Sequence, residues 1–141
     1  MSNYLFAYGT LQPGCAPAQM AAVVAKMRPL GEGSIRGHLY DLGGYPGAVP
    51  EANSESRIFG TVTELPEDPE ILRRLDTYEE CDPQSPGTGE YVRELREIEL
   101  ASGGTLTCWF YRYNWDPGEK ELIASGDWRR YRGRGSGVRD Q

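Results

Sequence analysis

Two neighbouring segments, residues 91–100 and 105–113, restrict most strongly what this chain can fold into. In the first, odd- and even-numbered side chains form two rows, as expected when successive side chains point to opposite faces of a strand. The second carries Trp109, Tyr111 and Tyr113, and such aromatic residues favour strands. Between them lies Ser102-Gly103-Gly104, a sequence suited to a tight turn. The pattern predicts a β-hairpin.

Three further segments are expected to be strands. Residues 4–8 are short and aromatic and end at Gly9, while residues 33–42 and 58–65 are apolar in a partly alternating pattern. By its turn chemistry, Gly43-Gly44-Tyr45-Pro46-Gly47 is expected to be a loop.

Two other segments have helical spacing. Residues 16–27 carry apolar side chains at positions 20, 23, 24 and 27, and Pro29 is expected to stop that helix. The second helix is expected to begin with Asp68 as its capping residue and Pro69 at its first position. Its last turn falls at or just before Glu79.

The order of these elements favours an α+β fold. About five strands are interrupted by two helices without regular β-α alternation, so the sheet is expected to curl or close rather than to be doubly wound. We expect residues 1–128 to form a single domain. Residues 129–141 are rich in Arg and Gly and are expected to be a flexible tail, with a contact to RNA or a membrane surface as an alternative.

Charge and cysteine content exclude several classes of protein. The net charge of −6, from 15 basic and 21 acidic residues, argues against a general nucleic-acid binder. The three cysteines are widely spaced and form no C-x-x-C pair, which argues against a disulfide framework and a zinc site. The sequence shows no signal peptide and no run long enough to span a bilayer, so a soluble, cytoplasmic protein is expected.

Two features could carry chemistry. The turn Tyr8-Gly9-Thr10-Leu11 follows a strand and precedes a helix, and exposed amides in such a turn can bind an anion or an oxyanion. Glu79, Glu80 and Asp82 crowd one helix end, and such crowding can raise the pKa of one carboxyl and suit it to act as a general base. Read singly, the two features favour an ordinary turn and a solvated helix end, and only their combination would point to a site.

The other reactive residue types are expected to have structural roles. His38 is the single histidine and lies within a strand, which fits a packed or surface residue. Cys15 follows a turn and could be a reactive thiol at a helix start, although it lacks a nearby base in the sequence. Cys81 and Cys108 are expected to be packing or surface residues, and the aromatic residues of the last two strands are expected to be mainly core.

Four motifs occur in a recognisable order: Tyr8-Gly9-Thr10-Leu11 with Gly14, Gly44-Tyr45-Pro46, Leu75-Asp76-x-Tyr78-Glu79 and Tyr91-x-Arg93. In this order they resemble the gamma-glutamylcyclotransferase-like (AIG2-like) family. Gly126-Asp127-Trp128 is similar to the ending of its short bacterial members. The resemblance covers residues 4–128 and implies a small mixed β-barrel-like sheet with helices outside it.

The resemblance also implies an activity. Family members release 5-oxoproline and a free amine or amino acid from gamma-glutamyl amides, by internal attack of the α-amine and without a metal or cofactor. The family's catalytic acid maps to Glu79, and Glu80 stands where many members have Gly. The residues then expected to bind the small-molecule substrate are Tyr8, Gly9, Thr10, Leu11, Tyr91 and Tyr111.

Three questions stay open at this stage. A non-catalytic module that binds a small carboxylate or serves in a stress response could use the same fold. The leaving amine is not specified, and neither is the oligomeric state.

Overall fold

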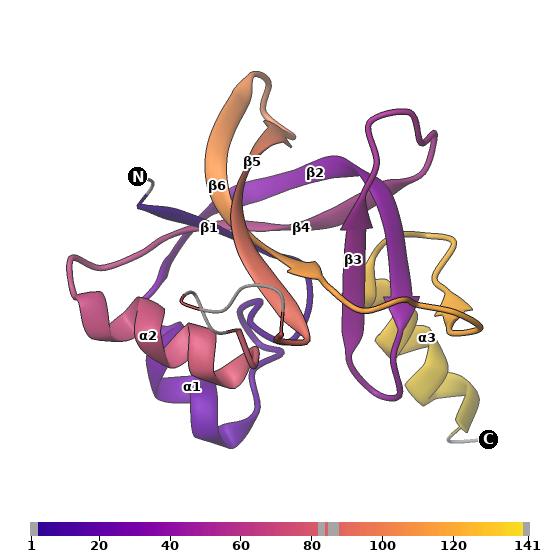
Figure 1. Cartoon of the computed structure of the whole chain (residues 1–141), viewed down its shortest axis with the longest axis horizontal. Coiled ribbons are helices and arrows are strands. Elements are labelled where there is room, and N and C mark those ends of the chain that lie inside the picture. The colour runs from indigo at the N-terminus through magenta and orange to yellow at the C-terminus, as the bar shows by residue number, and fades with distance from the viewer. Residues whose placement is uncertain (1–2, 82–83, 85–87, 140–141) are drawn as a thin grey trace.

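The computed structural model describes residues 3–81, 84 and 88–139, with residues 134–139 as backbone only. Within these residues, five strands form a closed mixed barrel (Figure 1). The order around it is β2 (Arg28–Asp41), β4 (Arg57–Glu64), β1 (Tyr4–Ala7), β6 (Thr105–Tyr113) and β5 (Tyr91–Leu100), which pairs back onto β2. The β1–β6 pair is parallel and the other pairs are antiparallel. The expected α+β fold with a closing sheet is confirmed, as is the predicted hairpin.

The barrel closes at Gly33, where β2 meets β5. Gly33 is opposite Leu100, and Ser34 is opposite Glu99. A Cβ atom at position 33 would lie 2.8 Å from Ile98 Cγ2 and 3.0 Å from the Glu99 carbonyl oxygen. Closure therefore depends on a residue without a side chain at this position.

The far half of β2 leaves the barrel and pairs with two short strands that the sequence did not predict. β3 (Pro46–Pro50) runs antiparallel to it, with Pro46 opposite Asp41, and β7 (Glu121–Leu122) pairs with the same segment. The prediction of a loop over residues 43–47 is wrong from Pro46 onward. Proline lacks a backbone donor and argues against a strand, but both prolines of β3 stand at its ends, where they are tolerated.

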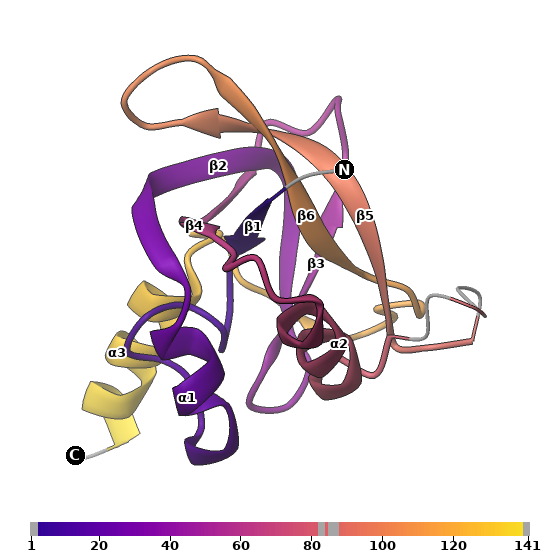
Figure 2. The same ribbon diagram turned by 90° about the vertical axis from the view of Figure 1, so that its left-hand side faces the viewer.

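The two predicted helices, α1 (Ala18–Ala25) and α2 (Pro69–Tyr78), lie on one side of the barrel (Figure 2). Asp68 caps α2 as predicted, since its side chain accepts a hydrogen bond from the Glu70 amide at 3.0 Å. α1 is shorter than expected, and Pro29 stands inside β2 rather than in a loop.

A third helix, α3 (Trp128–Arg139), corrects the expectation of two flanking helices. The Gly-rich composition of this segment predicts poor helix formation. Tertiary contacts offset that tendency: Trp128 is buried, the Asp127 side chain accepts from the Arg130 amide at 3.1 Å, and Tyr131 Oη donates to Asp41 at 2.7 Å. The domain boundary at residue 128 and a flexible tail beyond it stay predictions.

The apolar side chains form two clusters, because adjacent residues of a strand point to opposite faces. One cluster fills the barrel, with members such as Phe6, Ile58, Val62, Ile98 and Phe110. The other lies between the barrel and the helices α1 and α2, with members such as Leu5, Met20, Val23, Ile71 and Leu75. Tyr91 and Tyr111 belong to this second cluster.

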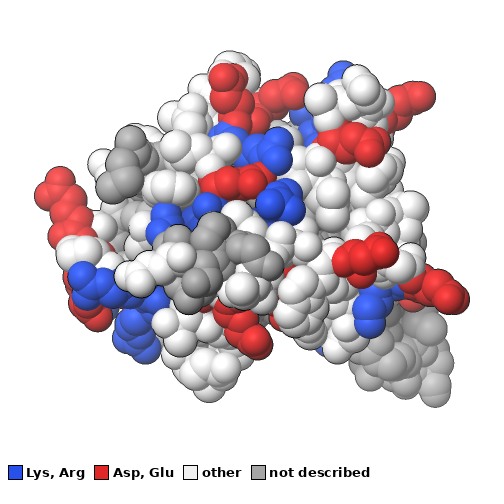
Figure 3. All heavy atoms as spheres, in the orientation of Figure 1, with Lys and Arg blue, Asp and Glu red and all other residues white. Residues whose placement is uncertain are grey.

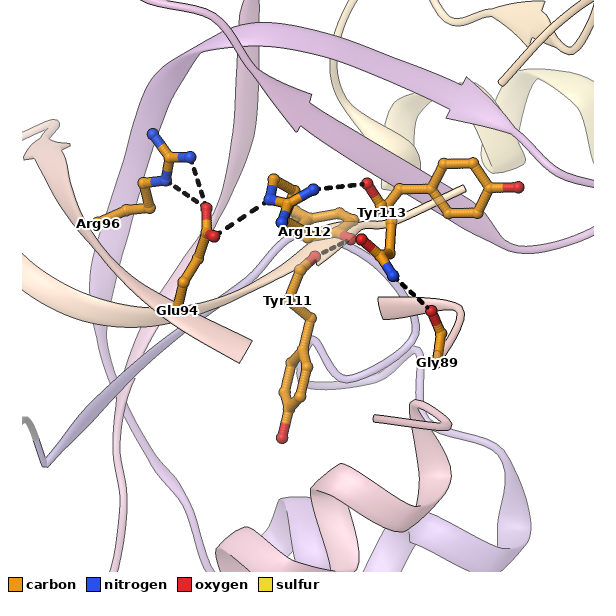
Figure 4. A network of polar contacts seen from close by, with 8 residues as sticks. Gly89, Glu94, Arg96, Tyr111, Arg112 and Tyr113 are labelled. Atoms are coloured by element: carbon orange, nitrogen blue, oxygen red, sulfur yellow. Dashed lines mark hydrogen bonds and ion pairs between the residues drawn. The ribbon is translucent and has the colours of Figure 1, made fainter. Parts of the chain in front are cut away.

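Three charged side chains of the hairpin form a network on the side away from Tyr111. Glu94 bridges Arg96 and Arg112 there, whereas Tyr111 points away from this network toward the helices (Figure 4). On the face shown in Figure 3, basic and acidic side chains are interspersed, so the described residues of this face present no continuous basic surface. No helix among the described residues is long and apolar enough to cross a membrane.

Candidate active site

A cavity of about 270 Å³ lies where the turn after β1 meets the end of α2. The predicted catalytic residue Glu79 lines it, and so do all six residues expected to bind substrate, namely Tyr8, Gly9, Thr10, Leu11, Tyr91 and Tyr111. The structure thus brings together segments separated by about a hundred residues in the sequence. The roles of these residues stay predictions.

The turn is held against two other walls of the cavity. A Cβ atom at Gly9 would lie 2.5 Å from Pro46 Cγ, so glycine is needed for Pro46 to approach this closely. Thr10 Oγ1 and Tyr78 Oη share a hydrogen bond of 2.7 Å, which joins the turn to the last residue of α2. No acceptor within the described part of the chain takes the amides of Thr10 and Leu11.

Glu79 follows the last residue of α2, and its amide donates to the Leu75 carbonyl at 2.9 Å. The residue is partly exposed at the cavity, yet protein surrounds much of its carboxyl. Desolvation, together with the nearby charge of Glu90, raises the pKa of Glu79 to about 8. Near neutral pH this carboxyl can therefore both take up and release a proton.

Glu90 is a cavity residue that the sequence did not reveal. It is only 8% exposed and accepts a hydrogen bond from Tyr45 Oη at 2.7 Å, which raises the pKa of Tyr45 to about 12. The described lining contains three carboxylates, Glu79, Glu80 and Glu90, and no Lys or Arg. The cavity therefore favours a cationic group. In the sequence, Glu90 is one acid at the end of a Gly-rich loop, and no local pattern distinguishes it.

Three tyrosines shape the cavity through hydrogen bonds to protein acceptors. Tyr8 Oη donates to the Tyr111 carbonyl and Tyr91 Oη donates to the Pro46 carbonyl, each at 2.6 Å. Tyr111 Oη donates to Asp76 at 2.7 Å. Burial raises the pKa of all three phenols, so they remain neutral.

A buried ion pair between Asp76 and Arg93 lies next to Tyr111 at the cavity. Arg93 Nε and an Arg93 terminal nitrogen donate to the two carboxylate oxygens of Asp76 at 2.8 and 3.1 Å. The Arg93 guanidinium lies 4.3 Å from the centre of the Trp109 ring. Asp76 also accepts from Tyr111, so one carboxylate connects α2, β5 and β6. The motifs around Asp76 and Arg93 thus meet directly in space.

Glu80 occupies the position after the α2 cap where helices usually place glycine. The Glu80 amide donates to the Thr77 carbonyl at 3.2 Å and the Cys81 amide donates to the Asp76 carbonyl at 2.8 Å, which together form a Schellman motif. Glu80 has φ of 52°, the left-handed region that a side chain disfavours. The backbone thus explains why glycine would suit this position.

We expect Glu80→Gly to stabilise the protein by about 0.5–1 kcal/mol, because it removes the left-handed strain at a small entropic cost. Urea unfolding would measure the change. Glu80→Ala is the matched control, since it removes the same charge but keeps Cβ. An equal gain in both variants would show that the charge, not the backbone, is the source.

Comparison with known proteins agrees with the family that the motifs resemble. A family model described as gamma-glutamyl cyclotransferase, AIG2-like, matches residues 5–130. The chain belongs to this family. It is also 32% identical over 125 residues to the gamma-glutamylcyclotransferase family protein YtfP of Escherichia coli K12, which covers 88% of this chain and 94% of YtfP.

Solved structures have the same fold as this gamma-glutamylcyclotransferase family chain. The solution structure of Escherichia coli YtfP matches with a TM-score of 0.58 at 31% identity, over 89% of this chain and 95% of YtfP. A mouse AIG2-like protein matches with a TM-score of 0.64 at 21% identity, over 82% and 80% of the two chains. Bacillus subtilis YkqA matches with a TM-score of 0.72 at 22% identity; this chain spans 43% of YkqA's length.

The remaining candidates lie outside the cavity of this family member. Cys81 and Cys108 are buried, as expected of packing residues, while Cys15 is partly exposed. His38 lies in β2 with its Nε2 atom 3.7 Å from Glu51. Asp82, named with the acidic helix end, is outside the described residues. No three His, Cys, Asp or Glu side chains gather into a possible metal site in the described part of the chain.

Proposed function

We propose that this chain is a gamma-glutamyl cyclotransferase, which releases 5-oxoproline and a free amine or amino acid from a gamma-glutamyl amide. One observation carries the proposal: Glu79, with a pKa raised to about 8, faces a small cavity that also contains the turn of residues 9–11. We assign Glu79 as the general base and the amides of this turn as the oxyanion donors, the two parts that an internal acyl transfer requires.

Recognition begins with the charge of the substrate. A gamma-glutamyl amide carries an α-ammonium group, and the cavity offers three carboxylates without a compensating Lys or Arg in its described lining. Glu90 holds this ammonium, while the amides of Thr10 and Leu11 bind either the substrate's carboxylate or the developing oxyanion. The bound cation also favours the carboxylate form of Glu79.

Glu79 then moves protons between the two nitrogens. Its carboxylate removes one proton from the α-ammonium, and the free amine attacks the γ-carbonyl carbon to form a tetrahedral oxyanion. The attacking nitrogen gives up a second proton as the ring closes, and the leaving nitrogen gains two as its bond to the γ-carbon breaks. The products are 5-oxoproline and a protonated amine.

Holding the substrate folded supplies much of the rate, since the attacking and attacked groups belong to one molecule. The reaction as written needs no metal or cofactor, and we infer that the protein works without one in the cytoplasm.

The test is release of 5-oxoproline from a panel of gamma-glutamyl amines, amino acids and glutathione. We expect turnover of at least one class. If the purified protein bound these compounds without releasing 5-oxoproline from any of them, it would instead be a small-carboxylate-binding module on the same fold.

The pH dependence follows from the raised pKa of Glu79. Between pH 6 and 7 the ionised fraction of a carboxyl with pKa about 8 rises tenfold, so kcat/KM should rise about tenfold over that unit. Above the pKa of the substrate's α-ammonium group, the rate should fall as that group loses the proton that Glu79 accepts. A kcat/KM profile that is flat from pH 6 to 8 would contradict this assignment.

A further inference from the structure

A second cavity, of about 490 Å³, opens beside the catalytic one. The two share Thr10, Tyr45 and Tyr78 as a common wall. Beyond that wall, the second cavity is lined by Trp128, Arg129 and Arg132 of α3, and we call it the arginine cavity. Figure 1 shows α2 and α3 at opposite ends of the lower side of the molecule, so the two cavities together run from the end of α2 to the start of α3.

The sizes of the cavities suggest that one substrate occupies both. The catalytic cavity, at about 270 Å³, lies below the roughly 300–1,000 Å³ of typical small-molecule sites. The second cavity, which shares a wall with the first, offers room for the leaving group of a gamma-glutamyl substrate whose γ-carbonyl is near Glu79.

The two cavities have opposite charge. Carboxylates line the first, whereas the arginine cavity offers two guanidinium groups and no acidic residue in its described lining. Arg129 donates to the Pro13 carbonyl, and the Arg132 guanidinium lies 5.5 Å from the centre of the Trp128 ring, so both are held in place without neutralisation by a carboxylate.

The charge of Arg132 contributes to lowering the pKa of Asp41, but both carboxylate oxygens of Asp41 have other partners. Tyr131 Oη donates to one oxygen at 2.7 Å, and the amides of Gly43 and Gly44 donate to the other at 2.9 and 3.0 Å. Arg132 therefore keeps donors for a ligand.

The placement of the arginines is unfavourable for the helix itself. Arg129 and Arg132 stand three residues apart on one face of α3, within its first two turns. The N-terminal end of a helix disfavours cations, and the first turn of α3 contains no acidic residue. Buried Trp128 fixes this end of the helix on the barrel, so the two charges remain at the cavity.

We propose that the arginine cavity binds the leaving group and selects leaving groups that carry a carboxylate. This inference rests on the proposed cyclotransferase function. It assigns gamma-glutamyl amino acids and peptides, rather than simple gamma-glutamyl amines, as the substrate class.

A matched substrate pair tests it, because gamma-glutamyl-alanine and gamma-glutamyl-ethylamine differ only in the leaving-group carboxylate. We expect kcat/KM to be about tenfold higher for the former, a typical effect of charge-assisted hydrogen bonds at a partly exposed site. The double variant R129Q/R132Q should abolish this preference and leave the ethylamine substrate unaffected. Arg130→Gln is the control, since Arg130 lies on the same helix but does not line the cavity. Equal preference in the double variant and the wild type would overturn the proposal.

A binding measurement separates this proposal from the proposed function. Cys15 is partly exposed and lines the arginine cavity, whereas Cys81 and Cys108 are buried. Gamma-glutamyl-alanine should therefore slow alkylation of Cys15 by iodoacetamide in Glu79→Gln, and gamma-glutamyl-ethylamine should do so less. Protection without turnover in the wild type would refute the cyclotransferase activity but support the cavity's role. Absence of any difference in protection would refute that role.

Discussion

Glu79→Gln should lower kcat/KM for 5-oxoproline release by about 10²–10⁴-fold, the usual contribution of a general acid–base group. Glutamine keeps the size of the side chain but cannot take the proton from the α-ammonium. The loss should appear mainly in kcat, because Glu90 still holds the substrate's ammonium in the cavity. Quantification of 5-oxoproline under single-turnover and steady-state conditions would measure it.

Glu80→Gln is the matched control, since it removes the adjacent charge from the same cavity wall. It should retain activity within a few fold of the wild type. If Glu79→Gln kept wild-type activity while Glu80→Gln lost it, the catalytic role would belong to Glu80.

The same substitution should change how stability depends on pH. The pKa of Glu79 is about 8 in the folded chain and about 4.3 in an unfolded one. Between these values the unfolded carboxyl is ionised and the folded one is protonated, so stability falls as pH rises through this window. Relative to Glu79→Gln, the wild type should lose at most roughly 1.4 kcal/mol per pH unit from pH 5 to 8. Parallel stability–pH curves for the two proteins would contradict the raised pKa.

Asp76→Ala should destabilise the fold by about 3–5 kcal/mol, as expected when one partner of a buried ion pair is removed. The side chains of Asp76 and Arg93 are only 9% and 14% exposed. Without Asp76, the Arg93 guanidinium is left uncompensated beside Trp109, and Tyr111 Oη loses its acceptor. The total free energy of unfolding of a natural protein is only about 5–15 kcal/mol, so this effect is large.

Urea unfolding would measure this effect, with Arg73→Ala as the control. Arg73 lies on the same helix and pairs with Glu70, but its side chain is 69% exposed. Arg73→Ala should lower the free energy of unfolding by no more than about 0.5 kcal/mol. Similar losses in the two variants would mean that the Asp76–Arg93 pair contributes little beyond a surface contact.

The hairpin and α2 were predictable because their signals are local. Strand alternation between residues 91 and 100 and the cap at Asp68 depend only on neighbouring residues, and β5 and the start of α2 follow them. β3 and α3 were missed for the opposite reason. β3 depends on pairing with β2, and α3 depends on burial of Trp128 and on a hydrogen bond from Tyr131 to Asp41, which is 90 residues away in the chain.

Part of the candidate site could likewise be predicted from the sequence, and part could not. The order of four short motifs pointed to Glu79 and to the turn at Gly9, and the structure brings these residues to one cavity. Glu90 and the arginine cavity were not predicted from the sequence. Burial and charge at a site depend on segments that lie far apart in the sequence and meet only in the folded chain.

By itself, the sequence determined the family, the α+β architecture and seven of the residues that line the candidate site, because periodicity, capping and motif order depend only on the order of residues along the chain. Only the tertiary structure decided how Glu79 differs from the other acids around it. Desolvation by the surrounding protein and the nearby charge of Glu90 raise its pKa to about 8. Neither cause exists until the turn after β1, the end of α2 and the start of β5 fold around one another.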